Sequence, residues 1–128
     1  MKKNILFLIM FIFIGILFLT PSYAQDIELD IKSAKCLDDD DKIVIQYSVI
    51  NYRDFERSNV SVAFRIMENG KPIACKELIM TIPKSSDGSE ILEAVIDTPC
   101  KGKSFGLQST IFHNVKRYRI EKWFEGCP

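Results

Sequence analysis

The chain has 128 residues, with 17 basic and 17 acidic side chains and a formal net charge of zero. This balance does not indicate nucleic acid or an anionic membrane as a partner. The length suits one domain, and the apolar content is enough for one hydrophobic core.

The first part of the chain has the three parts of a secretory signal peptide. Two lysines follow the initial methionine, an apolar run covers Ile5–Leu19, and small residues stand three and one positions before Gln25. The alternative is an uncleaved membrane anchor, but a bilayer-spanning helix needs about 20 apolar residues. We therefore expect a signal peptide at 1–24 and a secreted or periplasmic domain at 25–128, with no membrane span after cleavage. Cleavage would leave 15 basic and 17 acidic residues, a net charge of −2.

Four cysteines follow the signal peptide: Cys36, Cys75, Cys100 and Cys127. An even number of cysteines in an exported chain is typical of disulfide bonds, here two, with three possible pairings. The alternative is a structural zinc site, whose ligands usually come in pairs two to four residues apart. Successive cysteines here are 39, 25 and 27 positions apart, which favours disulfides.

Seven segments have the alternation or the bounding turns of β-strands. Between the third and the fourth stands Asn69-Gly70, a strong hairpin signal because a type I′ turn needs positive φ at both central residues. No stretch of ten residues shows a convincing helical period. The expected strands are Asp26–Lys35, Ile43–Asn51, Asn59–Met67, Lys71–Met80, Glu90–Asp97, Phe105–His113 and Val115–Phe124.

Alternation also predicts which side chains face the core. In the second strand Ile43, Ile45, Tyr47 and Val49 make one face, and Val44, Gln46, Ser48 and Ile50 make the other. In the third strand Val60, Val62, Phe64 and Ile66 point inward, and Ser61, Ala63, Arg65 and Met67 point outward.

Seven short strands separated by turns every 8–12 residues or so are typical of an immunoglobulin-like fold, so we expect a seven-stranded antiparallel β-sandwich with two disulfides. The order of strand features also resembles a family, the bacterial CARDB-type modules. The resemblance covers about residues 26–112, and it implies a fold like fibronectin III or immunoglobulin domains and a role in cell adhesion or extracellular protein contacts. It is carried by Asp26-Ile27-Glu28-Leu29, by Ile43-x-Ile45-x-Tyr47-x-Val49-x-Asn51, by Asn59-Val60-x-Val62-x-Phe64 and by Asn69-Gly70-Lys71.

The expected topology selects one disulfide pairing. Bonded cysteines need Cα atoms within about 7 Å of each other. The first and last strands are neighbours in such sandwiches, and the fourth and fifth face one another along the opposite side. We therefore expect the bonds Cys36–Cys127 and Cys75–Cys100.

The run Asp38, Asp39, Asp40 and Asp41 is expected to form a solvated loop, because adjacent carboxylates repel one another. A calcium site is the functional alternative, since carboxylate oxygens suit a hard cation. The run lacks the alternating spacing of a calcium loop. We expect no cofactor and no metal other than this alternative.

The chain offers little for catalysis. His113 is its single histidine, and nucleophilic catalysis needs a nucleophile, a base and an orienting group. We therefore expect a protein that is not an enzyme.

The residues that alternation places on the outer side of the third, sixth and seventh strands are the candidates for partner binding. Arginine and aromatic residues are enriched at the centres of protein interfaces. A register shifted by one residue would instead make Phe112 and Trp123 core residues and would expose Tyr118, Ile120 and Phe124. Lys71, Pro72, Lys76 and Glu77 on the fourth strand are typical of a protected edge. The candidates are Arg65, Met67, Phe112, Arg117, Arg119 and Trp123.

Together these features indicate an exported, non-enzymatic protein-interaction module, an adhesion-like protein or an accessory subunit of an envelope or extracellular assembly. The expected partner is another protein. The alternatives are a β-sandwich that binds a small ligand or a carbohydrate through its loops or Trp123, and a secreted inhibitor.

Overall fold

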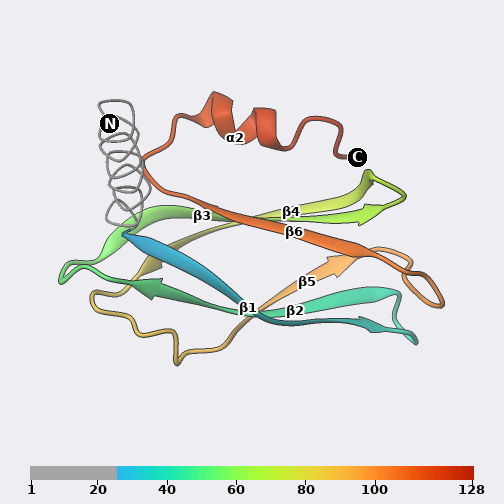
Figure 1. Cartoon of the computed structure of the whole chain (residues 1–128), viewed down its shortest axis with the longest axis horizontal. Coiled ribbons are helices and arrows are strands. Elements are labelled where there is room, and N and C mark those ends of the chain that lie inside the picture. The colour runs from blue at the N-terminus through green and yellow to red at the C-terminus, as the bar shows by residue number, and fades with distance from the viewer. Residues whose placement is uncertain (1–25) are drawn as a thin grey trace, which may run out of the picture.

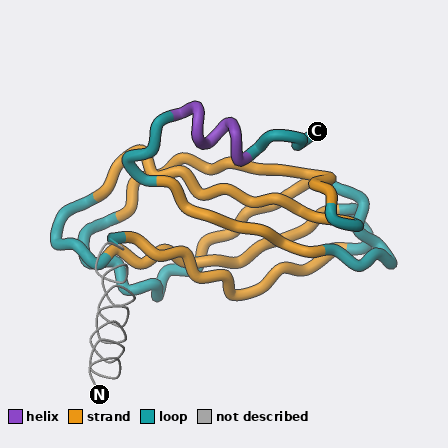
Figure 2. The backbone as a smooth tube through the Cα atoms, turned by 45° about the horizontal axis from the view of Figure 1, so that its top comes forward, coloured by secondary structure: helices purple, strands orange, loops and turns teal. Residues whose placement is uncertain are grey.

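The computed structural model describes residues 26–128, so the signal peptide expected at 1–24 lies outside the described residues. Two three-stranded antiparallel sheets pack face to face, and a short helix lies along the outer face of one of them (Figures 1 and 2). The elements are β1 (Ile27–Leu37), β2 (Lys42–Asn51), β3 (Arg57–Glu68), β4 (Lys71–Ile82), β5 (Leu92–Asp97), β6 (Gly106–Phe112) and α2 (Arg117–Trp123).

The strand order is β1-β2-β5 in one sheet and β4-β3-β6 in the other. The first six expected strands are confirmed in place, with boundaries that differ by a few residues. Between Ile31 and Ser33 the register of β1 against β2 shifts, which marks a β-bulge. After this bulge Ala34 and Cys36 lie opposite Ile45 and Ile43, on the core side.

The core lies between β2 and β3, as their alternation predicts. The expected inward face of β3 is confirmed, and the face of β2 that carries Ile43, Ile45, Tyr47 and Val49 is buried as well. The rings of Tyr47 and Phe64 meet edge to face across the two sheets, with centroids 5.3 Å apart. The hairpin between β3 and β4 is confirmed as well, since Asn69 and Gly70 have φ of 53° and 76°.

Asn51 at the end of β2 ties two loops together at one end of the sandwich. Its side-chain amide donates hydrogen bonds to the carbonyls of Phe55 (2.9 Å) and Pro83 (3.0 Å), and its Oδ1 accepts one from the backbone N–H of Arg53 (3.0 Å). The side chain is 2% exposed, so these bonds replace the water that burial removes.

The expected seventh strand is wrong, because Arg117–Trp123 forms the helix α2. The physical reason lies on β3, where Ser61 and Ala63 occupy outward positions and are nevertheless buried. These small side chains leave room for a covering element, and α2 lies on that face (Figure 1). The helix itself is supported by an ion pair between Arg117 and Glu121, one turn apart at 3.7 Å.

The expected disulfide pairing is also wrong: the bonds are Cys36–Cys100 and Cys75–Cys127. Because the last segment is a helix over the outer face, it carries Cys127 to β4 rather than to the neighbourhood of β1. Cys36 instead meets Cys100, which follows β5 and is 3% exposed. The bonds close separations of 64 and 52 residues, worth about 4 kcal/mol each in the chain-entropy account.

The loop between β4 and β5 folds back over the end of β2. Asp87 forms an isolated β-bridge with Ile50, and Gly88 has φ of 83°. A Cβ added to Gly88 would lie 2.9 Å from Cγ1 of Ile50 and 3.4 Å from the hydroxyl of Ser48. That hydroxyl is fully buried and has no hydrogen-bond partner within residues 26–128, so the close approach of this loop is what covers it.

We expect Gly88→Ala to lower the free energy of unfolding by about 2 kcal/mol, from backbone strain and the clash with Ile50. Gly70→Ala is the matched control, because Gly70 has a similar φ of 76° but nothing within 4 Å of its added Cβ. It should cost only the strain, about 1 kcal/mol. Urea denaturation of both variants measures the difference. Equal losses of unfolding free energy in the two variants would show that the loop moves away from Ile50 at no energetic cost.

Candidate functional site on the outer face of the β4-β3-β6 sheet and along the edge of β6

The structure brings most of the expected partner-binding residues together on one face. Arg65 and Met67 lie on the outer side of β3, Phe112 ends β6, and the remaining three belong to α2. Three of the six are joined through Trp123, which contacts both Arg65 and Phe112 within the chain. We call these three residues the helix-docking cluster.

Arg65 is the centre of the helix-docking cluster. Its guanidinium lies over the ring of Trp123, 4.2 Å from the ring centroid, and its Nη1 donates a 2.8 Å hydrogen bond to the Trp123 carbonyl. The other terminal nitrogen donates to the side-chain carbonyl of Gln108 on β6. One side chain of β3 therefore holds the C-terminal end of α2 to β6, with a cation–π contact and two charge-assisted hydrogen bonds.

Aromatic side chains complete the cluster. Trp123 meets Phe112 edge to face at 6.0 Å and Phe124 at 4.9 Å. Ile120, the buried residue of the helix, is 7% exposed. These contacts favour the packing interpretation of Phe112 and Trp123, and a role of the two residues in partner binding stays a prediction.

A second set of polar contacts holds the other end of α2. The carboxylate of Glu77 on β4 accepts a 2.8 Å hydrogen bond from Arg117 Nη1 and another from the hydroxyl of Ser61. The hydrogen bond from Arg117 is the main cause that holds the pKa of Glu77 below its usual value of 4.5, and the bond from Ser61 acts in the same direction. The same pair raises the pKa of Arg117.

Two of the expected partner-binding residues have few contacts within the chain. Arg119 is exposed, and its Nε donates a 3.3 Å hydrogen bond to the hydroxyl of Tyr118, which is 58% exposed. Met67 is half-buried opposite Gly106 and Pro72. Partner binding through Arg119 or Met67 stays a prediction.

The sandwich has four edge strands, and three of them carry features that discourage pairing with another chain. β1 has a bulge and the charged residues Asp30, Lys32 and Lys35. β4 begins with Lys71-Pro72, and β5 has six residues, two of them acidic. Lys76 points inward from β4, opposite Phe64, and donates a 2.7 Å hydrogen bond to the Val95 carbonyl of β5.

The fourth edge strand, β6, has none of these features. Its sequence, Gly-Leu-Gln-Ser-Thr-Ile-Phe, contains no charged residue and no proline, and its register with β3 is regular. Within residues 26–128 it pairs with β3 alone, because the segment expected beside it is the helix α2. Sequence reasoning missed this open edge because it placed a seventh strand there.

The side chains next to this edge leave the core incompletely covered. Leu107 and Ile111 of β6 and Leu29 and Ile31 of β1 point toward the core but are only partly buried. Ser109 lies opposite the buried Phe64 and yet is exposed. β1 contacts β6 along this side, so these residues lie where the two sheets meet beside the edge of β6.

The other candidate groups do not assemble into a chemical site. Asp38, Asp39 and Asp40 are exposed in the turn between β1 and β2, as is Asp41. In the part of the chain that the structure describes, no group of three or more His, Cys, Asp or Glu side chains is placed to hold a metal ion. The calcium alternative therefore receives no support from the structure.

His113 lies near Arg57 and Asp26 at the end where β2 and β3 are joined. Asp26 receives hydrogen bonds from Arg53 Nε (2.7 Å) and Arg57 Nη2 (2.8 Å), and the bond from Arg53 is the main cause that lowers the pKa of Asp26. Burial, and then the positive charge of Arg57, lowers the pKa of His113. This arrangement is an ion-pair cluster, and within it the structure records no hydrogen bond from His113 to a nucleophile.

Comparison of the chain with known protein families, with curated proteins and with solved structures finds no match to any of them. The resemblance to CARDB-type modules therefore stays a prediction. Within residues 26–128, no helix has the length and apolar character to cross a bilayer.

Trp123→Ala should lower the free energy of unfolding by about 2 kcal/mol, because it removes the cation–π contact with Arg65 and the packing against Phe112. Arg119→Ala should change it by less than about 0.5 kcal/mol, because Arg119 is exposed and contacts only its neighbour. Thermal unfolding of both variants, each followed by circular dichroism, measures the two effects. A Trp123→Ala protein as stable as the parent would mean that α2 is not held by this cluster.

Docking of α2 should weaken at acidic pH. Folding lowers the pKa of Glu77. The contribution of the Glu77 carboxylate to the stability of the folded protein is therefore complete above about pH 4.5, and it is lost as the pH falls from there through the folded-state pKa. Fluorescence of Trp123, the single tryptophan, reports the docking between pH 7 and pH 3.

Glu77→Gln should flatten this part of the pH profile. Glu121→Gln is the control, because Glu121 lies 3.7 Å from Arg117 and accepts no hydrogen bond from it. An unchanged profile in Glu77→Gln would assign the acid sensitivity to other carboxyl groups, of which Asp26 is the first candidate.

Proposed function

We propose that this protein is an exported protein-interaction module with an immunoglobulin-like fold that lacks the last strand, and that it binds an extended segment of a partner protein along β6. The strand orders β1-β2-β5 and β4-β3-β6 support the fold assignment, since they match such a sandwich without its seventh strand. The two disulfides are consistent with an oxidising, exported location.

The observation that carries the proposal is the contrast between β6 and the other three edges. Proteins protect exposed strand edges against pairing with charges, prolines and bulges. β1, β4 and β5 have such devices, and β6 has none. An edge that is left unprotected while the others are protected is best explained by use in strand addition, in which backbone hydrogen bonds give affinity and alternate side chains give specificity.

The side chains beside β6 indicate the chemistry of the partner segment. An added strand would place alternate side chains over the partly buried Leu107 and Ile111, and over Leu29 and Ile31 of β1. Apolar residues at every second position of the partner would bury this surface. The contacts of α2, among them the hydrogen bond between Arg117 and Glu77, keep the C-terminal segment away from the edge of β6. That segment therefore does not compete with the partner for the edge.

Selection of random 12-residue peptides on the oxidised protein tests the proposal. We expect the selected peptides to have apolar, β-branched residues at alternate positions, and to slow hydrogen exchange of the Gln108–Ile111 amides by at least about tenfold. Ser109→Lys, which adds an inward-pointing charge at this exposed position, should weaken their binding by at least about tenfold.

Gln46→Lys is the control, because it adds the same charge on the outer face of β2, away from β6. It should leave peptide affinity unchanged, and both variants should keep the thermal stability of the parent. Peptides that protect β4, β5 or α2 instead of β6 would contradict the proposal. So would concentration-dependent dimerisation that protects β6, because the occupant would then be a second copy of this chain.

A further inference from the structure

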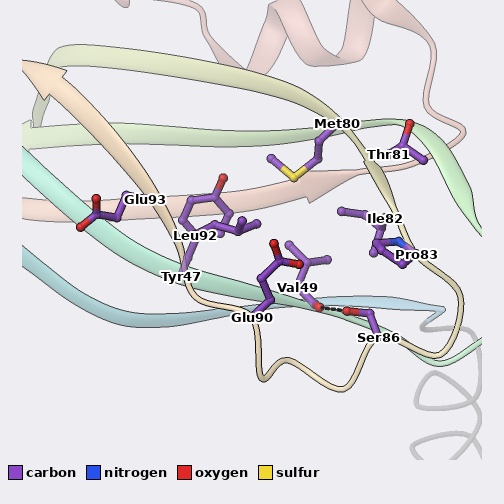
Figure 3. A pocket seen from close by; sticks show the side chains of 10 residues that line it. All are labelled: Tyr47, Val49, Met80, Thr81, Ile82, Pro83, Ser86, Glu90, Leu92 and Glu93. Atoms are coloured by element: carbon purple, nitrogen blue, oxygen red, sulfur yellow. Dashed lines mark hydrogen bonds between the residues drawn. The ribbon is translucent and has the colours of Figure 1, made fainter.

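A cavity of about 370 Å³ opens between the two sheets on the side opposite to β6 (Figure 3). It forms where the chain leaves β4 and runs around the end of β2 before β5 begins at Leu92. This detour leaves Val49 without a paired strand on the side away from β1, because β5 pairs with β2 only as far as Tyr47. The lining residues are Tyr47, Val49, Met80, Thr81, Ile82, Pro83, Ser86, Glu90, Leu92 and Glu93.

The floor of the cavity is apolar except for one hydroxyl group. Val49 and Ile82 are buried, and Leu92 packs against the core beside them. Tyr47 is 2% exposed, and its hydroxyl has no hydrogen bond among those that the structure records for residues 26–128. Burial raises the pKa of Tyr47, so the hydroxyl stays protonated at neutral pH. The hydroxyl is not one of the fully buried polar atoms that lack a partner, so it meets the open space of the cavity and is available to a ligand.

The mouth of the cavity carries a negative charge. In Figure 3 the Glu90 carboxylate points toward the space between Tyr47 and Val49. None of the ion pairs or side-chain hydrogen bonds of the described chain involves Glu90. The hydroxyl of Ser86 is already used, since it donates a 3.1 Å hydrogen bond to the Val49 carbonyl. The other lining carboxylate, Glu93, accepts a 3.4 Å hydrogen bond from Gln46 on the outer face of the sheet, so Glu90 is the carboxylate that a cationic ligand would meet.

We propose that this cavity binds a small amphipathic cation, an arylalkyl amine that places its ammonium group at Glu90, its ring between the sheets and a polar ring substituent at Tyr47. The volume lies in the range of small-ligand sites, and such sites combine apolar walls with polar groups that orient the ligand. A neutral or anionic analogue of the same shape lacks the attraction to the carboxylate.

Four small molecules test the proposal on the oxidised protein by isothermal titration calorimetry. Tyramine, 2-(4-hydroxyphenyl)ethanol and 4-hydroxyphenylacetate differ mainly in charge, and phenethylamine is tyramine without its hydroxyl. We expect tyramine to bind with a Kd of about 1 mM or tighter, the neutral alcohol at least about tenfold more weakly, and the anion not measurably. Phenethylamine should bind about threefold more weakly than tyramine.

Two substitutions locate the binding groups. Glu90→Gln should weaken tyramine binding at least about tenfold and remove the preference over the neutral alcohol. Tyr47→Phe should remove the preference for tyramine over phenethylamine and leave the preference for a cation, because it deletes only the hydroxyl. Asp97→Asn, at the far end of β5, changes the net charge by the same amount as Glu90→Gln and should have no effect.

An ammonium group on an apolar chain also occurs in lysine side chains of other proteins. Nα-acetyl-lysine-N-methylamide tests that source, and tighter binding of this compound than of tyramine would overturn the assignment to a small arylalkyl amine. Equal affinities for the cation, the alcohol and the anion would overturn the role of Glu90. Absence of tyramine binding up to about 10 mM, in a protein whose thermal stability is normal, would overturn the site itself.

Discussion

The guanidinium of Arg65 lies under the C-terminal helix, and its contacts determine where the last segment of the chain lies. It stacks on Trp123, donates to the Trp123 carbonyl and reaches Gln108 of β6. With α2 held in this position, β3 is covered on both faces, and the outward Ala63 is as buried as the inward Phe64. The same position brings Cys127 to Cys75 and leaves the far edge of β6 without a neighbouring strand.

The two open sides of the sandwich differ in physical character. On one side Lys76 of β4 reaches across to the Val95 carbonyl of β5, so the two edges are bridged and an inward charge discourages pairing there. Beyond this bridge the chain leaves the sheet and forms the cavity at Tyr47. On the other side no side chain bridges β1 and β6 in the described residues, and apolar side chains remain partly exposed. One side thus carries the proposed small-ligand cavity, and the other carries the edge proposed for strand addition.

Much of the candidate site was predictable from the sequence, but its organisation was not. Alternation correctly placed Arg65 and Phe112 on the outer face of the second sheet, because strand side chains alternate strictly. It failed at Arg117–Trp123, because a helix of seven residues is too short for a helical period to emerge. A signal was nevertheless present: Ser61 and Ala63 are small residues at outward positions of a central strand, where a covering element packs closely.

The sequence by itself determined the local features: six strands, the two faces of β2, the inward face of β3, and the Asn69-Gly70 hairpin. These depend on side-chain alternation and on backbone dihedral preferences, which act between near neighbours. Only the tertiary structure decided the disulfide pairing, the position of the last segment and the openness of β6. These depend on which distant segments meet, and contacts such as that of Arg65 with Trp123 join residues 58 positions apart, which no local pattern encodes.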